Sequence, residues 1–264
     1  MTRYAVGSIA LNVVVAGSGP PLVLVHGFPL DHRMWQAQIE ALADEHLVIA
    51  PDLRGFGASD VTPGTVTMQQ MADDLAALLD VLAVGQPVTL AGLSMGGYVA
   101  WQFALRHRPR LARLILCDTR AQADTPEAAA GRLALADRVV AEGAAVVAET
   151  LLPRLFAPST YTQRPALVAA TREVILRTNP EGIAAALRGM AQRPDVRPQL
   201  REIEVPALVL GGEEDAISPP EEMQQIAQAL PRGMWVPIPQ AGHMAPCEQP
   251  QQVNQAIRQF LAAS

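Results

Sequence analysis

A serine between two glycines is the residue best suited to nucleophilic chemistry in this sequence. The segment Gly92 to Gly96 reads Gly-Leu-Ser-Met-Gly, directly after the apolar run Val88 to Ala91 and directly before a helical pattern. A strand that turns sharply into a helix holds a serine in a strained conformation, and the flanking glycines remove Cβ atoms that would clash with the neighbouring strand and helix. The hydroxyl then stands above the sheet edge, near amide donors at the helix start. Ser94 is therefore the predicted nucleophile.

A serine hydroxyl is a weak nucleophile until a base accepts its proton, so a histidine must be found among the five in the chain. His243 lies in a loop between the last predicted strand and the final helix, where side chains from different strand ends converge. Two other histidines have structural explanations. His46 lies at the start of a predicted strand, and His107 lies at the C-terminus of a predicted helix, where it interacts favourably with the helix dipole. His26 is expected to brace a turn, whereas His32 either lines the substrate pocket or is exposed. We predict that His243 is the base.

The histidine needs an acid that orients it. Asp215 follows the predicted strand Ala207 to Leu210, and the chain order Ser94, Asp215, His243 is typical of one class of hydrolase. Asp118 ends the preceding strand and is a rival, because its position at the same edge of the sheet also allows it to reach the histidine. The two glutamates before Asp215 are expected to be solvated. We favour Asp215.

The negative charge that develops on a substrate oxygen needs backbone donors. The amide of Met95, just after the nucleophile, is one candidate. The other is the amide of Phe28, in the tight turn His-Gly-Phe-Pro that follows the apolar run Pro21 to His26. Pro29 has no N–H and cannot donate.

These residues require a scaffold in which strands and helices alternate, and the sequence has that pattern. A mainly parallel sheet covered by helices is the predicted fold, with an opening hairpin at Arg3 to Val6 and Ile9 to Ala16. The other predicted strands are Pro21 to His26, Leu47 to Ala50, Val88 to Ala91, Leu114 to Cys117, Ala207 to Leu210 and Met234 to Ile238. The predicted helices are Met34 to Ala43, Met68 to Leu82, Met95 to His107, Pro220 to Leu230 and Pro250 to Ala262.

The stretch from 120 to 198 breaks the alternation. It holds alanine-rich helical segments separated by prolines and contains no good strand. An insertion of this kind between two strands indicates a helical lid over the sheet. We therefore predict one domain, with its core in residues 1–119 and 199–264 and a lid in residues 120–198.

Composition excludes several classes of function. Half of the 264 residues are hydrophobic and 17% are charged, which predicts a globular protein with a sizeable core. The net charge is −6 and no basic block occurs, so neither nucleic acid nor an anionic membrane is an expected partner. The cationic residues are all arginine, so mechanisms that need a lysine amine are excluded.

No metal or cofactor is expected either. Cys117 and Cys247 are too few for a disulfide framework and lack metal-ligand spacing. No dinucleotide or phosphate-loop fingerprint occurs. No run approaches the roughly 18 apolar residues of a membrane span, and we predict a cytoplasmic protein. The sequence leaves the oligomeric state open.

Taken together, these motifs resemble the α/β-hydrolase fold superfamily over essentially the whole chain. The resemblance is carried by the elbow at Ser94, the turn at 26–29, the segment 52–59 (Asp-Leu-Arg-Gly-Phe-Gly-Ala-Ser), the Asp215 loop and Gly242-His243. It implies an eight-stranded, mainly parallel sheet flanked by helices, and a structural role for the segment 52–59. The sequence is most similar to small bacterial carboxylesterases, cofactor-free haloperoxidase-like perhydrolases and 3-oxoadipate enol-lactonases.

The expected activity is hydrolysis of small or medium carboxylic esters through an acyl-serine. Lactone hydrolysis of the enol-lactonase type is an alternative, although the lid reads Arg-Leu-Phe at 154–156 where those enzymes commonly carry Arg-Trp-Phe. A second alternative is perhydrolase activity, because Pro29 resembles a proline of the perhydrolase-like members. A non-catalytic small-molecule receptor is disfavoured, because a receptor gains nothing from an activated serine. The predicted substrate pocket contains Trp35, Leu155, Phe156 and Met190, together with Phe28.

Overall fold

An eight-stranded sheet forms the centre of the computed structural model, which describes residues 1–263. The strand order is β1-β2-β4-β3-β5-β6-β7-β8. The pairs β1–β2 and β2–β4 are antiparallel, and every later pair is parallel. The strands are β1 (Thr2–Val6), β2 (Ile9–Ala16), β3 (Pro21–Val25), β4 (Leu47–Pro51), β5 (Val88–Leu93), β6 (Leu111–Cys117), β7 (Ala207–Gly212) and β8 (Gly233–Ile238).

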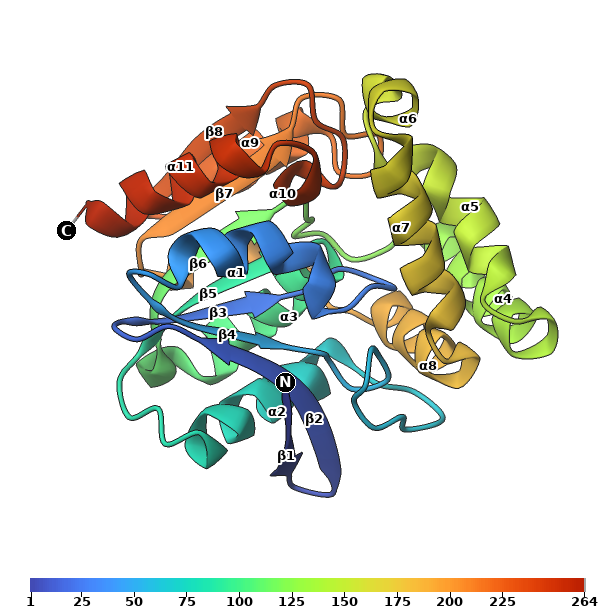
Figure 1. Ribbon diagram of the computed structural model, residues 1–264, viewed down its shortest axis with the longest axis horizontal. Coiled ribbons are helices and arrows are strands. Elements are labelled where there is room, and N and C mark those ends of the chain that lie inside the picture. The colour runs from blue at the N-terminus through green and yellow to red at the C-terminus, as the bar shows by residue number, and fades with distance from the viewer. Residues whose placement is uncertain (264) are drawn as a thin grey trace.

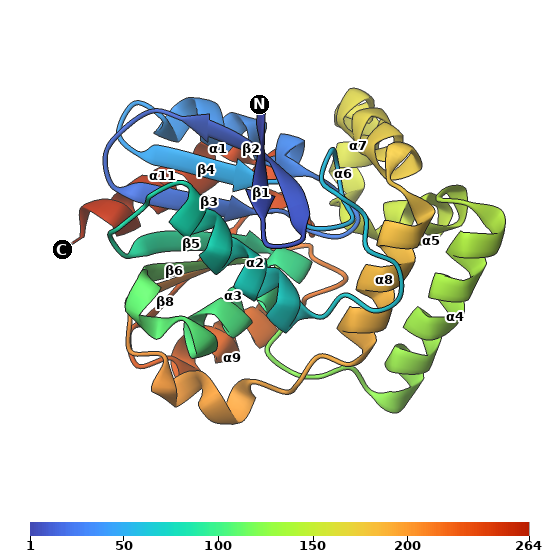
Figure 2. The same ribbon diagram turned by 90° about the horizontal axis from the view of Figure 1, so that it is seen from below.

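The central strands are apolar along their whole length because helices cover both faces of the sheet. Every residue of β3, β5 and β7 is buried. Figure 2 shows α2, α3 and α9 on one face and α1 and α11 on the other. These helices are α1 (Gln36–Leu42), α2 (Met68–Val81), α3 (Met95–Arg106), α9 (Pro220–Ala229) and α11 (Pro250–Ala262), with the short α10 (Ala245–Glu248) before the last.

The predicted elements are all present, with shifted ends. The helix expected from Met34 divides into a 3₁₀ helix, His32–Trp35, and α1. Strand β6 begins three residues before the predicted Leu114, at Leu111. The predicted eight-stranded, mainly parallel sheet is confirmed. Within residues 1–263, no helix has the length and hydropathy needed to cross a bilayer.

Five α-helices come between β6 and β7 and lie together beside one end of the sheet (Figure 1). Glycines bring α8 close to the rest of the chain. A Cβ on Gly182 would lie 2.0 Å from the carbonyl oxygen of Gly55, and one on Gly189 would lie 1.8 Å from that of Val66. These helices are α4 (Pro126–Glu142), α5 (Ala145–Leu155), α6 (Pro158–Gln163), α7 (Pro165–Arg177) and α8 (Pro180–Ala191).

Candidate active site

Ser94 occupies a strained turn between β5 and α3. Its φ of 53° lies in the left-handed region, which a non-glycine residue seldom adopts. A Cβ on Gly92 would lie 2.3 Å from the carbonyl oxygen of Gly96, and a Cβ on Gly96 would lie 2.3 Å from that of Val25. Only glycine fits at these two places, which is the physical reason for the Gly-x-Ser-x-Gly spacing.

A chain of hydrogen bonds runs from Ser94 through His243 to Asp215. The Nε2 atom of His243 lies 2.8 Å from the Ser94 hydroxyl, and its Nδ1 lies 2.8 Å from Oδ2 of Asp215. The other carboxylate oxygen, Oδ1, accepts the N–H groups of Ile217 (2.7 Å) and Ser218 (3.0 Å). The carboxylate is therefore fixed by its own loop. With an Nδ1–H donated to Asp215, Nε2 is left to accept the serine proton.

Asp118, the rival acid, makes no hydrogen bond to His243 within residues 1–263. Its Oδ1 accepts the N–H of Gly212 at 2.8 Å, while Oδ2 is buried and has no hydrogen-bond partner among residues 1–263. Burial, together with the nearby charge of Asp215, raises the pKa of Asp118 well above its usual value. The protonated form of Asp118 is therefore favoured more strongly than in an exposed aspartate, and the side chain supports the end of β7, from which the Asp215 loop leaves.

The remaining histidines have structural partners. His26 accepts the Leu53 N–H at Nε2 (2.9 Å) and lies 2.9 Å from the Gly27 carbonyl oxygen at Nδ1, so it braces the turn as expected. Burial lowers the pKa of His26. Neither expectation for His32 was correct, because it is buried outside the cavity at Ser94 and its Nδ1 lies 2.6 Å from Oδ1 of Asp52.

The two amides expected to hold an oxyanion are free of protein acceptors in the described chain, residues 1–263: neither Phe28 N–H nor Met95 N–H donates to another residue. The turn that carries Phe28 is packed against the elbow, since a Cβ on Gly27 would lie 2.6 Å from Cδ2 of Leu93 and 3.6 Å from Cβ of Ser94. The turn is closed by a hydrogen bond from Leu30 N–H to the Gly27 carbonyl, 2.9 Å long.

A cavity of about 370 Å³ opens over Ser94 and His243. Its floor includes Phe28, and its walls come mainly from α4, α5 and α8. Of the predicted pocket residues, Leu155 and Met190 line it. The lining residues that the sequence did not indicate are Tyr98, Ala128, Gly131, Arg132, Leu135, Thr150, Leu151, Leu187 and Ile217.

Two predicted pocket residues do not line the cavity. Trp35 ends the 3₁₀ helix and is fully buried in the core, where its indole nitrogen has no hydrogen-bond partner within residues 1–263. Phe156 turns its ring edge-on to Tyr161, with 5.9 Å between ring centroids, and its backbone packs against Gly242. Neither aromatic side chain is among the residues that line the cavity.

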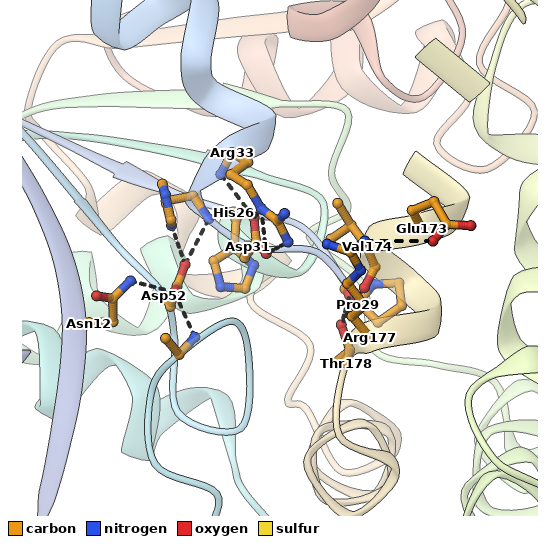
Figure 3. A network of polar contacts seen from close by, with 12 residues as sticks. Asn12, His26, Pro29, Asp31, Arg33, Asp52, Glu173, Val174, Arg177 and Thr178 are labelled. Atoms are coloured by element: carbon orange, nitrogen blue, oxygen red, sulfur yellow. Dashed lines mark hydrogen bonds and ion pairs between the residues drawn. The ribbon is translucent and has the colours of Figure 1, made fainter. Parts of the chain in front are cut away.

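The cluster Asp31, His32 and Asp52 has ligand atoms close enough to hold a metal, but its carboxylates already have protein partners (Figure 3). Oδ1 of Asp52 accepts the backbone N–H of His32 (2.9 Å), and Oδ2 accepts the Asn12 side-chain amide (2.8 Å). Asp31 forms an ion pair with Arg33, 2.6 Å from Oδ2 to Nη2. A metal would have to displace these partners.

The comparison with known proteins gives the family. A model of the alpha/beta hydrolase fold family matches residues 20–250, and the chain belongs to this family. A 3-oxoadipate enol-lactonase 2 of Acinetobacter baylyi is 31% identical over 96% of this chain and 93% of its own length. The prediction of a hydrolase of this superfamily is confirmed.

Solved structures agree. A thermophilic esterase from Thermogutta terrifontis, solved with malate bound, is 51% identical and superposes with a TM-score of 0.97 over 99% of this chain and 98% of its own. An enol-lactonase from Burkholderia xenovorans LB400 is 31% identical, with a TM-score of 0.92 over 98% of this chain and 99% of its own.

Proposed function

We propose that the protein is a serine esterase that hydrolyses small or medium carboxylic esters through an acyl-serine. The observation that carries the proposal is the hydrogen-bond chain Ser94–His243–Asp215, with 2.8 Å at each link. In this order, the imidazole can accept the proton of the serine hydroxyl, and the fixed carboxylate stabilises the positive charge that the imidazole then carries.

In the proposed mechanism, Oγ of Ser94 attacks the ester carbonyl carbon while Nε2 of His243 accepts the hydroxyl proton. Asp215 stabilises the imidazolium that forms. The amides of Phe28 and Met95 donate to the oxyanion. His243 then returns the proton to the leaving alcohol as the C–O bond breaks, and the acyl group remains on Ser94. A water molecule, deprotonated by His243, cleaves the acyl-serine and releases the carboxylic acid.

We infer that helices α4 to α8 act as the lid over this site. Their side chains form most of the cavity wall, and the cavity of about 370 Å³ suits a small or medium acyl chain rather than a polymer. Burial of the reacting groups beneath these helices strengthens every electrostatic contact with the substrate. The stronger likeness to an esterase, at 51% identity against 31% for the enol-lactonases, favours open-chain esters over lactones.

Hydrolysis of p-nitrophenyl esters from acetate to octanoate by the wild type and Ser94→Ala tests the proposal. We expect turnover with a chain-length optimum in the wild type and a loss of at least about 10³-fold in the variant. A fluorophosphonate probe should label the wild type at Ser94 and leave Ser94→Ala unlabelled. A folded wild type that neither turns over esters nor reacts with the probe would instead support a binding protein.

A further inference from the structure

Two guanidinium groups lie in the wall of the cavity above Ser94. Arg132 comes from α4 and Arg154 from α5. Most of the remaining lining is apolar, with Phe28, Leu135 and Leu187 among its residues. A hydrophobic acyl chain alone gives no reason for cations at this place, since a charge beside an apolar ligand loses hydration without compensation.

Arg132 is held in position from behind. Its Nε donates to Oδ2 of Asp124 at 2.6 Å, and Nη1 contacts the sulfur of Met190 at 3.6 Å. Within residues 1–263, Nη2 of Arg132 donates no hydrogen bond. The side chain is 27% exposed, and Arg132 is one of the residues that line the cavity.

Asp124 does not need Arg132 for charge balance. Arg193 already pairs with its other oxygen, Nη1 to Oδ1 at 2.7 Å, and both of these side chains are buried. The guanidinium of Arg193 also stacks on the ring of Tyr98, 4.3 Å from the centroid. One carboxylate thus faces two guanidiniums, so the cluster of Asp124, Arg132 and Arg193 carries a net charge of +1 at the cavity wall.

Arg154 adds a second cation. It forms no ion pair with an acidic residue of the described chain, and its Nη2 donates to the carbonyl of Ala216 at 3.0 Å. Ala216 follows Asp215, so this contact holds Arg154 over the loop of the orienting acid. Arg154 is exposed, whereas Arg132 is anchored by Asp124, and each of the two guanidiniums has N–H groups left to donate.

We propose that the substrate is an ester with a carboxylate at the end remote from the scissile bond, and that Arg132, assisted by Arg154, binds this carboxylate. The proposal rests on the proposed esterase function and names its substrate class, the half-esters of dicarboxylic acids. A planar guanidinium fork matches a carboxylate, and the apolar walls between Arg132 and Ser94 accommodate the methylene chain.

Monomethyl adipate and methyl hexanoate form a matched pair, because they differ only in whether the acyl chain ends in a carboxylate or a methyl group. We expect the wild type to prefer monomethyl adipate in kcat/KM. Arg132→Gln should reduce that preference about tenfold or more, because kcat/KM should fall for monomethyl adipate and stay unchanged for methyl hexanoate. Arg132→Lys should retain part of it. Arg138→Gln, which alters an exposed arginine on the same helix, paired with Glu142, is the control.

Calorimetry separates this inference from the esterase proposal. Monomethyl adipate and methyl hexanoate are titrated into Ser94→Ala with and without Arg132→Gln. Binding of the charged ester that is lost with Arg132 supports the inference even if the wild type hydrolyses neither ester. The inference is wrong if the wild type hydrolyses methyl hexanoate as well as monomethyl adipate and Arg132→Gln leaves the ratio of the two kcat/KM values unchanged. That result would leave the esterase proposal intact. Thermal unfolding confirms that each variant is folded.

Discussion

Glu248 accepts the backbone N–H of Gly242, the residue that precedes His243, at 2.8 Å. Its other oxygen accepts the N–H of Ala157 (2.8 Å) and the hydroxyl of Thr160 (2.6 Å), both at the start of α6. Glu248 is buried, so all three bonds form out of water. One carboxylate thus connects the histidine loop to the helices above the cavity, and the position of His243 depends on theirs.

Replacement of Glu248 by glutamine tests this connection. An amide has one acceptor oxygen, so either Gly242 or Ala157 loses its acceptor and faces an NH₂ group. We expect kcat for p-nitrophenyl butyrate and the rate of Ser94 labelling to fall about 10- to 100-fold, with a smaller change in KM, because the loss falls on the serine–histidine geometry.

Thr160→Val is the matched control for Glu248→Gln. It removes one hydrogen bond to Glu248 on the α6 side and leaves the bond to Gly242, so the labelling rate should stay near that of the wild type. Equal losses in the two variants, or a lower melting temperature with an unchanged labelling rate in Glu248→Gln, would show that Glu248 stabilises the fold without positioning His243.

A methyl group at position 242 should push the histidine loop away from the start of α6. A Cβ on Gly242 would lie 2.5 Å from the backbone nitrogen of Ala157 and 2.6 Å from the carbonyl carbon of Phe156. Backbone atoms cannot rotate away, so Gly242→Ala should displace the histidine loop and lower kcat at least about tenfold. Gly85→Ala, where a Cβ meets nothing within 4 Å, should match the wild type in kcat. Equal activity in both variants would contradict the tight contact.

The sequence predicts the parts of the site that local rules determine. The elbow at Ser94 follows from backbone sterics within five residues. His243 and Asp215 could be chosen because the ends of parallel strands meet at one edge of the sheet. In the structure, the imidazole of His243 lies 2.8 Å from both the Ser94 hydroxyl and the Asp215 carboxylate. The catalytic roles of the three residues stay predictions, which the activity and labelling experiments test.

Side chains whose direction depends on tertiary packing could not be predicted in this way. Trp35 is near Phe28 in sequence, but the 3₁₀ helix turns it into the core. Phe156 follows Leu155, yet only Leu155 lines the cavity, because neighbouring residues of a helix end point in different directions. Arg132 lies in an alanine-rich stretch without a motif, and it reaches the cavity only because α4 packs beside α8.

Asp118 should make the stability of the protein depend on pH. Burial and the charge of Asp215 raise its pKa well above its usual 3.8, so the folded state holds a proton that the unfolded state releases. The stabilisation is present below about pH 4 and is lost as the pH rises towards the pKa of the folded state. Asp118→Asn carries no titrating group at this position, so we expect its melting temperature to rise relative to that of the wild type as the pH increases above about 4. Parallel curves would contradict the raised pKa.

Asp52 should have the opposite effect. Burial by itself raises its pKa, but hydrogen bonds from the side chain and backbone of His32 and from Ala58 outweigh it, and the net pKa of Asp52 lies well below its usual 3.8. The stabilisation is therefore complete above about pH 4 and is lost as the pH falls through the pKa of the folded state. Asp52→Asn should lower the free energy of unfolding in urea at pH 7 by roughly 2–4 kcal/mol, and the gap should narrow below pH 4. Asp44→Asn, at an exposed carboxylate, is the control and should follow the wild type. A gap of constant size from pH 7 to pH 3 would show that the shape of the side chain, and not the negative charge of Asp52, accounts for the loss.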